Sequence, residues 1–146
     1  MSASSLKAYV IDDQRSMRSI IMTLLRQLGI TQLTEAESGS QALDILSTSQ
    51  NKPDFILCDL YMEKGGGIDF INGIRRHERL RELHIPIILL TGEEDQMILG
   101  VGQQVGAAAV LHKPCSLAEL AKAIGKVVGF NIAPIMEHRA SAGQNA

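Results

Sequence analysis

Cysteines, an excess of basic residues and long apolar runs are all scarce or missing in this sequence. Its two cysteines, Cys58 and Cys115, are too few for a disulfide framework. No window approaches the roughly 18 uninterrupted apolar residues of a membrane span, and residues 1–7 lack the pattern of a signal peptide. A formal net charge of -2 leaves no basic excess for general binding to nucleic acid. We therefore expect a cytoplasmic protein without membrane insertion or direct nucleic-acid binding.

The chain of 146 residues suits one domain. We place this domain at residues 1–129, because helical periodicity ends near Gly129, and we expect residues 130–146 to form a C-terminal tail or linker. Within the domain, short apolar runs alternate with segments whose apolar residues recur at helical spacing. The expected strands are 6–11, 32–36, 55–59, 85–90 and 108–112, and the expected helices are 17–28, 38–46, 68–74, 95–105 and 116–128.

Two kinds of local signal support the expected helices. Gly29 follows the first helix where a C-terminal cap is expected, and capping-box pairs open two later helices, Ser38 with Gln41 and Ser116 with Glu119. The first helix also carries an apolar stripe that we expect to face the core. This stripe consists of Met17, Ile20, Ile21, Leu24, Leu25 and Leu28.

The apolar runs at 55–58 and 85–90 are continuous instead of alternating, which is typical of strands covered on both faces. Strands that alternate with helices in this way predict an α/β fold of five βα units. The sheet is expected to be parallel, with helices on both sides and right-handed crossovers, in a three-layer sandwich.

Polar side chains follow the expected strands at the points where these strands end. Asp12 and Asp13 follow the first strand, Asp59 ends the third, Thr91 follows the fourth and Lys113 follows the fifth. Because ligands of open α/β sheets bind outside the carboxyl ends of the strands, we expect these groups to share one site. Three carboxylates in one cleft repel each other, and a hard divalent cation such as Mg²⁺ relieves that repulsion.

Each of these residues also has an ordinary structural interpretation when it is taken alone. Asp13 can cap a helix, Asp59 can open a turn, Thr91 can cap a helix or a turn, and Lys113 can be a surface lysine at a strand end. Their common position at one edge of the sheet favours the functional interpretation. A carboxylate beside a bound cation can then act as a nucleophile and form an acyl phosphate.

Four segments of the sequence resemble the CheY-like receiver domain of two-component response regulators. They are VIDD at 10–13, ILCDLYM at 56–62, IILLTGE at 87–93 and GAAAVLHKP at 106–114. The resemblance extends over roughly residues 6–128. It implies a flavodoxin-like sheet with strand order 2-1-3-4-5, as is known for this fold.

The resemblance also implies the roles of the acidic residues. Asp59 matches the phospho-acceptor, Asp13 is expected to bind Mg²⁺ directly and Asp12 through water, and the backbone carbonyl of Tyr61 matches a third protein ligand. The side chains of Tyr61 and Glu93 occupy positions that flank the acceptor and influence the lifetime of the phosphoryl group. A bulky Tyr61 is expected to hinder attacking water.

Thr91 and Lys113 match the switch hydroxyl and the phosphate-contacting lysine of the family, and the Lys113–Pro114 peptide bond is usually cis there. The family often has an aromatic switch residue where this chain has Val110. Signal transmission by a swinging ring is therefore not expected here. The output face expected from the resemblance includes Leu99, Val110, His112 and Lys122.

The resemblance implies a non-enzymatic signalling switch. Its expected partners are a histidine kinase or histidine phosphotransfer protein and a downstream protein target. One alternative, a haloacid-dehalogenase-type phosphatase, needs a second aspartate two residues after the nucleophile. Tyr61 stands at that position after Asp59, and Gln14 after Asp12. The other alternative is a receiver-shaped scaffold that binds its partner constitutively, and the presence of all five chemical positions argues against it.

Overall fold

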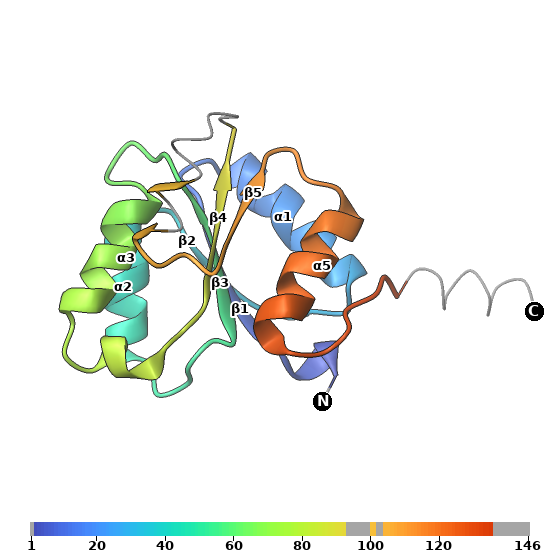
Figure 1. Ribbon diagram of the computed structural model, residues 1–146, viewed down its shortest axis with the longest axis horizontal. Coiled ribbons are helices and arrows are strands. Elements are labelled where there is room, and N and C mark those ends of the chain that lie inside the picture. The colour runs from blue at the N-terminus through green and yellow to red at the C-terminus, as the bar shows by residue number, and fades with distance from the viewer. Residues whose placement is uncertain (1, 93–99, 102–103, 136–146) are drawn as a thin grey trace, which may run out of the picture.

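The computed structural model describes residues 2–92, 100–101 and 104–135. It shows a five-stranded parallel sheet with the order β2-β1-β3-β4-β5, so the predicted α/β fold and strand order are confirmed (Figure 1). The strands are β1 (Lys7–Ile11), β2 (Gln32–Ala36), β3 (Phe55–Asp59), β4 (Ile87–Thr91) and β5 (Ala109–His112).

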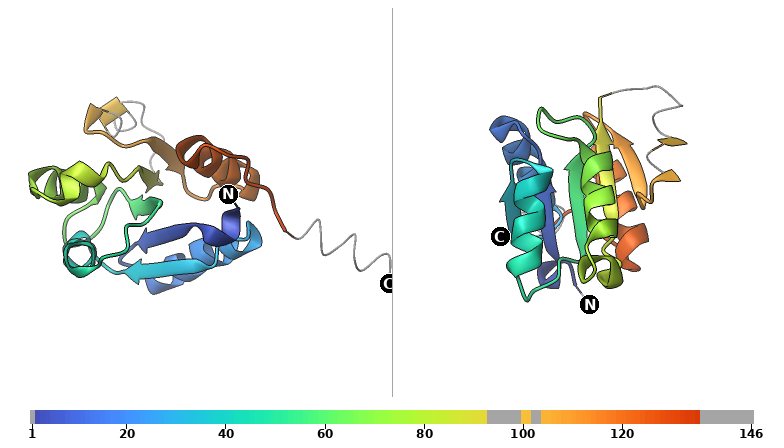
Figure 2. Two further views of the ribbon diagram at one scale, coloured as in Figure 1. Left: turned by 90° about the horizontal axis from the view of Figure 1, so that it is seen from below. Right: turned by 90° about the vertical axis from the view of Figure 1, so that its left-hand side faces the viewer.

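Helices cover both faces of the sheet. In Figures 1 and 2, α2 (Gly39–Thr48) and α3 (Gly67–Arg76) lie on one face, and α1 (Arg15–Gln27) and α5 (Leu117–Val128) lie on the other. Short 3₁₀ helices occur at Ala3–Ser5 and Leu80–Leu83. Most of the helix predicted at 95–105 lies outside the described residues. In the part of the chain that the structure describes, no helix is both long and apolar enough to cross a membrane.

The hydrophobic core lies in two layers, one on each side of the sheet. Every residue of β3 and of β4 is buried, as their continuous apolar runs predict for strands covered on both faces. The parallel register pairs Ile11 with Cys58 and Thr91 with His112. The residues that follow these strand ends are therefore brought to the same edge of the sheet.

The predicted capping boxes differ in outcome. Ser116 accepts a hydrogen bond from the backbone N–H of Glu119 at 3.0 Å, and the Glu119 carboxylate accepts one from the Ser116 N–H at 3.1 Å, so this box is complete. Ser38 accepts from the Gln41 N–H at 3.1 Å, but the Gln41 side chain accepts from the N–H of Glu37 instead of Ser38. Only half of that box forms, because the Gln41 side chain reaches one residue further back.

One member of the predicted apolar stripe on α1 does not face the core. Ile20 is 55% exposed, whereas Ile21 and Leu25 are buried. The stripe is wider than the face of α1 that the sheet and α5 cover, so a residue at its margin remains in solvent. Gly29 follows α1 with a φ of +83°, as expected for a C-terminal cap.

The packed part of the chain continues beyond the predicted domain boundary at residue 129. Gly129 ends α5 with a φ of 86°, and the chain then crosses from α5 toward the end of α1. Ile132 is 6% exposed and belongs to the core on the α1–α5 side. The backbone N–H of Ile135 donates to the carbonyl of Gln27 at 2.8 Å. This extended segment has no helical period, so its packing leaves no periodic signal in the sequence.

Candidate functional site

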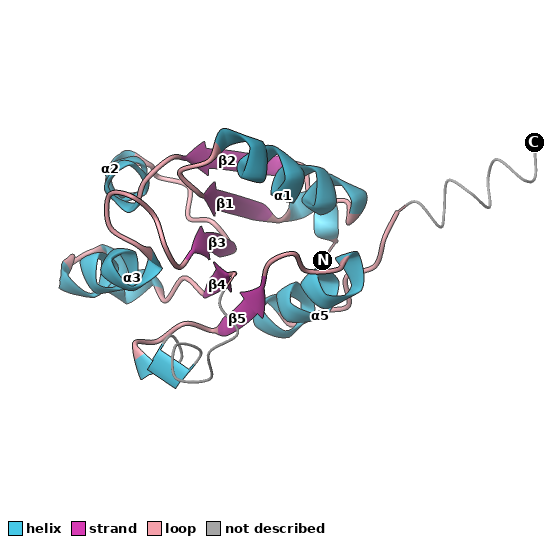
Figure 3. Cartoon of the chain, turned by 90° about the horizontal axis from the view of Figure 1, so that it is seen from above, coloured by secondary structure: helices cyan, strands magenta, loops and turns pink. Residues whose placement is uncertain are grey.

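Four charged side chains meet at the carboxyl edge of the sheet, which faces the viewer in Figure 3. Asp12 and Asp13 follow β1, Asp59 ends β3 and Lys113 follows β5. One carboxylate oxygen from each aspartate lies within 4.8 Å of the others. The strand order explains this meeting, because β1 and β3 are neighbours at the centre of the sheet.

Asp12 is fully buried, and its two carboxylate oxygens have different surroundings. Oδ1 accepts a hydrogen bond from the backbone N–H of Gln14 at 2.9 Å. Oδ2 has no hydrogen bond to any described residue, and the Nζ of Lys113 lies 3.5 Å from it. A buried carboxylate oxygen without a hydrogen bond calls for an explanation, and a bound cation provides one.

Asp59 is 7% exposed, and its closest charged neighbour is Lys113, whose Nζ lies 3.2 Å from Oδ2. The backbone N–H of Tyr61 approaches Oδ1 at a long 3.4 Å. Burial raises the pKa of the Asp59 carboxyl above its ordinary value; the Lys113 ammonium opposes this shift and the charge of Asp12 adds to it. The site thus holds a buried carboxylate that a second cation would stabilise in its charged form.

Asp13 is exposed at the mouth of the site. Its Oδ2 accepts a hydrogen bond from the backbone N–H of Glu63 at 2.9 Å, so the loop after β1 is joined to the loop after β3. Sequence reasoning missed this contact, because it joins two loops whose distance depends on strand order. The same carboxylate belongs to the acidic cluster with Asp12 and Asp59.

Thr91 and Lys113 lie on neighbouring strands at this edge. Thr91 is fully buried at the end of β4, and its carbonyl accepts a hydrogen bond from the backbone N–H of Lys113 at 2.7 Å. The Lys113–Pro114 peptide bond is cis, as the resemblance implies. The Lys113 side chain is 19% exposed, and its ammonium contacts both Asp12 and Asp59.

The other predicted residues lie around the cluster or outside the described chain. The Tyr61 side chain is 55% exposed, and Glu93 and Leu99 lie outside the described residues. Val110 packs against the core layer on the α2–α3 side, and His112, two residues further on, lies on the same face of β5. Lys122 is exposed on α5, beside the opposite layer. The predicted output residues that the structure describes are therefore divided between the two sides of the edge strand β5.

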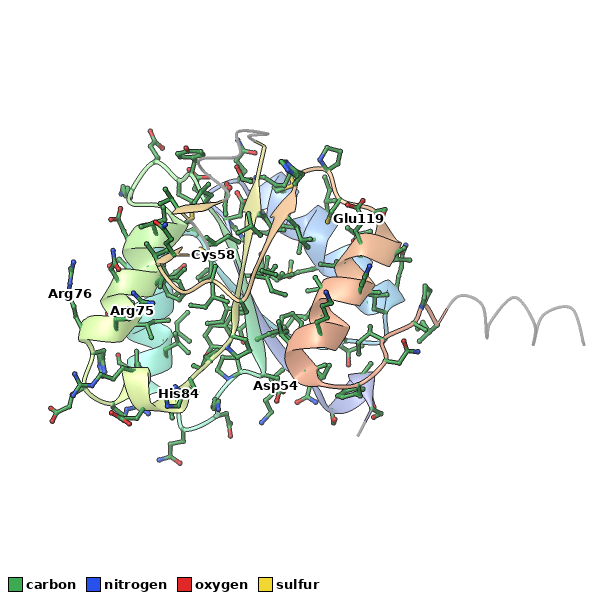
Figure 4. All side chains as sticks on the ribbon, viewed as in Figure 1. Asp54, Cys58, Arg75, Arg76, His84 and Glu119 are labelled. Atoms are coloured by element: carbon green, nitrogen blue, oxygen red, sulfur yellow. The ribbon has the colours of Figure 1, made fainter. Side chains whose placement is uncertain are left out.

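The Cys58 thiol, next to Asp59 in β3, is a poor nucleophile. Cys58 is fully buried in β3, in the interior of the molecule in Figure 4. Burial first, and then the charges of Asp59 and Asp12, raise the pKa of this thiol far above its ordinary value. The thiol therefore remains protonated at neutral pH, and a thiol is a poor nucleophile compared with a thiolate.

Arg18 contacts the backbone of the acidic pair Asp12 and Asp13. Arg18 of α1 donates from Nη1 to the backbone carbonyl of Asp12 at 2.6 Å, and its Nε lies 3.0 Å from Oε1 of Glu35. Sequence reasoning missed Arg18. No local pattern identifies it, because its partners depend on how β1, β2 and α1 pack together.

The residues present fit a divalent cation. Three carboxylates face one ammonium, one of their oxygens is buried without a hydrogen bond, and the donor set consists of oxygen. Mg²⁺ prefers oxygen ligands and is commonly held by one or two carboxylates together with water and phosphate. Asp12, Asp13 and Asp59 are the described side chains that would hold it.

Comparison with known proteins agrees with this architecture. The family model for the response regulator receiver domain matches residues 8–125. The chain is 34% identical over 122 residues to chemotaxis protein CheY of Pseudomonas aeruginosa, covering 84% of this chain and 95% of that protein. It is 32% identical over 123 residues to chemotaxis protein CheY-3 of Vibrio cholerae, covering 84% of this chain and 92% of that protein.

Solved structures show the same fold. A response regulator receiver domain protein from Clostridium thermocellum matches with a TM-score of 0.74 and 28% identity, over 85% of this chain and 94% of that one. The chemotaxis response regulator CheY4 of Vibrio cholerae matches with a TM-score of 0.72 and 26% identity, over 84% of this chain and 98% of that one. With its parallel sheet and the acidic cluster at the carboxyl edge, the chain belongs to the response regulator receiver domain family.

Proposed function

We propose that this protein is a cytoplasmic, phosphorylation-controlled protein-binding switch that accepts a phosphoryl group on Asp59. The observation that carries the proposal is the position of the Asp59 carboxylate. It shares one cluster with Asp12 and Asp13, within 4.8 Å, and lies 3.2 Å from the Lys113 ammonium. A nucleophile, a set of cation ligands and a counter-charge for phosphate thus occupy the same site.

The proposed step transfers a phosphoryl group from a phosphohistidine on a histidine kinase or phosphotransfer protein. A carboxylate oxygen of Asp59 attacks phosphorus, a P–O bond forms, and the P–N bond to the donor imidazole breaks. The imidazole takes the electron pair of the broken bond and, once protonated from solvent, is an ordinary histidine. The product is an acyl phosphate on Asp59.

Asp12, Asp13, Asp59 and the backbone carbonyl of Tyr61 would hold Mg²⁺ in this site. When bound, Mg²⁺ would neutralise negative charge on the phosphoryl oxygens and on the carboxylates. The Lys113 ammonium contributes a second positive charge beside Asp59. Burial of Asp12 excludes water from one side of the cluster, which strengthens these interactions.

We further propose that Thr91 and Lys113 link the phosphoryl group to an output surface. Thr91 ends β4 and Lys113 follows β5 at the site edge. The described residues expected at the output surface, Val110, His112 and Lys122, lie on β5 and α5. Moving a two-state equilibrium from 1:99 to 99:1 needs about 5.5 kcal/mol of differential interaction. Charge-assisted hydrogen bonds from Lys113 and Thr91 to a phosphoryl dianion are of the kind that can contribute to it. The downstream partner is a protein.

Incubation with acetyl phosphate and Mg²⁺, followed by intact mass measurement, tests the proposed acceptor. One added phosphoryl group is expected on the wild-type protein, and none on Asp59→Asn or after chelation of the divalent ion. Asp54→Asn is the matched control, because Asp54 lies at the opposite edge of the sheet (Figure 4) and asparagine keeps an oxygen for the Lys7 N–H. Modification of Asp59→Asn to the wild-type extent would contradict the proposal.

The same experiment separates the alternatives. A phosphatase would release phosphate continuously from an exogenous ester, whereas a receiver is expected to stop at one phosphoryl group per chain. A constitutive scaffold would bind its protein partner equally before and after phosphorylation. Equal partner affinity before and after phosphorylation would contradict the proposed switch, but it would not contradict the proposed phosphorylation of Asp59.

A further inference from the structure

The side chain of Arg18 is largely buried behind the acidic cluster. It is 12% exposed, whereas the Glu35 side chain with which it pairs is 47% exposed. Its Nε lies 3.0 Å from Glu35 Oε1, and Nη1 donates to the carbonyl of Asp12 at 2.6 Å. One guanidinium therefore joins β2, through Glu35, to the residue that follows β1.

The contact with the Asp12 carbonyl bears directly on the acidic pair. That carbonyl belongs to the planar peptide unit between Asp12 and Asp13, so its orientation sets the direction in which the chain enters Asp13. On the other side of Asp12, the backbone N–H donates to the carbonyl of Ala36 at 3.1 Å. Both peptide units that flank Asp12 are therefore held by hydrogen bonds.

We propose that Arg18 is a positioning residue of the phosphorylation site, which orients the Asp12–Asp13 peptide for cation binding, and that Glu35 holds its guanidinium in place. This inference deepens the proposed function and rests on it. Neither residue touches the carboxylate oxygens of the cluster through any contact that the structure describes. Their effect passes through the backbone of the residues that supply those oxygens.

The geometry requires an arginine. Its planar guanidinium presents Nε to Glu35 and Nη1 to the Asp12 carbonyl at the same time, whereas the single ammonium of lysine cannot reproduce both directions. The register that pairs Val10 with Glu35 places Glu35 close to the end of β1, where Arg18 can reach it. Groups that orient metal ligands in this indirect way typically change metal affinity about 10- to 100-fold when they are removed.

The test measures Mg²⁺ affinity of the unphosphorylated full chain by titration calorimetry, with no phosphoryl transfer involved. Arg18→Met is expected to raise the Kd for Mg²⁺ about tenfold, and Glu35→Gln is expected to raise it less. Arg18→Lys should recover part of the affinity, because lysine can still reach one acceptor. Arg26→Met is the matched control, since Arg26 is exposed on the last turn of the same helix.

A purely structural role for Arg18 would lower thermal stability without changing the Kd for Mg²⁺, and that result would overturn the inference. If Arg18→Met does not fold, Glu35→Gln still tests the inference. Glu35 is half exposed and glutamine keeps the side-chain volume, so this variant is expected to fold. The wild-type protein is expected to bind Mg²⁺ and to accept a phosphoryl group. If it does both, and the Mg²⁺ affinity of Glu35→Gln and of Arg18→Lys equals that of the wild type, this inference alone is overturned. A wild-type protein that does neither would overturn the proposed function as well.

Discussion

The Nζ atom of Lys113 lies 3.2 Å from Oδ2 of Asp59, and the same ammonium lies 3.5 Å from Oδ2 of Asp12. The lysine thus bridges a carboxylate at the end of β3 and another that follows β1. Without a metal ion, it provides the positive charge nearest to both groups among the described residues. Two predictions follow from this position, one for cation binding and one for pH.

Replacing Lys113 by Met should strengthen Mg²⁺ binding to the unphosphorylated protein. The ammonium repels a divalent ion placed among the same carboxylates. In a water-like medium, a divalent and a monovalent cation about 4 Å apart repel each other by about 2 kcal/mol, or about 30-fold in Kd. Titration calorimetry measures the change. Lys126→Met on α5 is the control, because Lys126 is an exposed lysine away from the cluster. Weaker binding in Lys113→Met would show that the lysine organises the cation site instead of competing with the ion.

Metal-free Asp59→Asn should be more stable than the wild-type protein at pH 7. Burial raises the pKa of Asp59 above its ordinary value of 3.8, so this group favours the folded state at low pH. That contribution is lost as the pH rises through the folded-state pKa, where the buried carboxylate becomes charged. We expect a stability difference between the two proteins at pH 7 that shrinks as the pH falls toward the ordinary pKa. Urea unfolding at several pH values, with chelator present, measures it.

The exposed Asp44→Asn serves as the control for that experiment, because Asp44 lies on the surface of α2 and is not part of the acidic cluster. A stability difference between Asp59→Asn and wild type that grows toward acid pH would contradict the prediction. Addition of Mg²⁺ should favour the wild-type protein, because the ion binds the folded state.

Replacing Tyr61 by Asn should shorten the lifetime of the phosphoryl group on Asp59. The Tyr61 side chain is 55% exposed and its backbone N–H approaches the Asp59 carboxylate. We therefore expect the residue to lie beside the path by which water would reach an acyl phosphate on Asp59. A carboxamide is smaller and can hydrogen-bond to the attacking water. Phosphate release after removal of the donor measures the decay. Tyr61→Phe should decay as the wild type does, and an unchanged or slower decay in Tyr61→Asn would count against steric protection.

Replacing Ile132 by Ala should lower the free energy of unfolding by about 2–4 kcal/mol. Ile132 is 6% exposed and packs into the core layer shared by α1 and α5, although it lies beyond the predicted domain boundary. Chemical denaturation measures the loss, and Asn131→Ala at the exposed neighbouring position is the control. Equal stability of wild type and Ile132→Ala would mean that residues 130–135 do not contribute to the folded unit.

Replacing Ser116 by Ala should cost about 1 kcal/mol of stability, because it removes the N-cap of α5. The Ser116 hydroxyl accepts from the Glu119 N–H at 3.0 Å. In return, the Ser116 N–H donates to the Glu119 carboxylate at 3.1 Å, and this hydrogen bond lowers the pKa of the Glu119 carboxyl. The exposed Ser40→Ala on α2 is the comparison in thermal unfolding. A loss in Ser116→Ala no larger than in Ser40→Ala would contradict the assigned cap.

The amino-acid sequence encodes the features that depend on neighbouring residues in a way that can be read without the structure. The continuous apolar runs identified β3 and β4 as buried strands, and the Ser116–Glu119 pair identified the start of α5. The positions of Asp59 and Lys113 at strand ends followed from the same local patterns. These features are encoded by side-chain period and capping chemistry, which act over a few residues.

Tertiary structure alone decided which distant residues meet. The hydrogen bond from Glu63 to Asp13, the reach of Arg18 to Asp12, the exposure of Ile20 and the burial of Ile132 follow from strand order and helix packing. No local period encodes them, because each depends on the relative position of elements that the chain connects through long crossovers. The acidic residues of the site are therefore evident in the sequence, whereas the contacts that orient them emerge only from the folded chain.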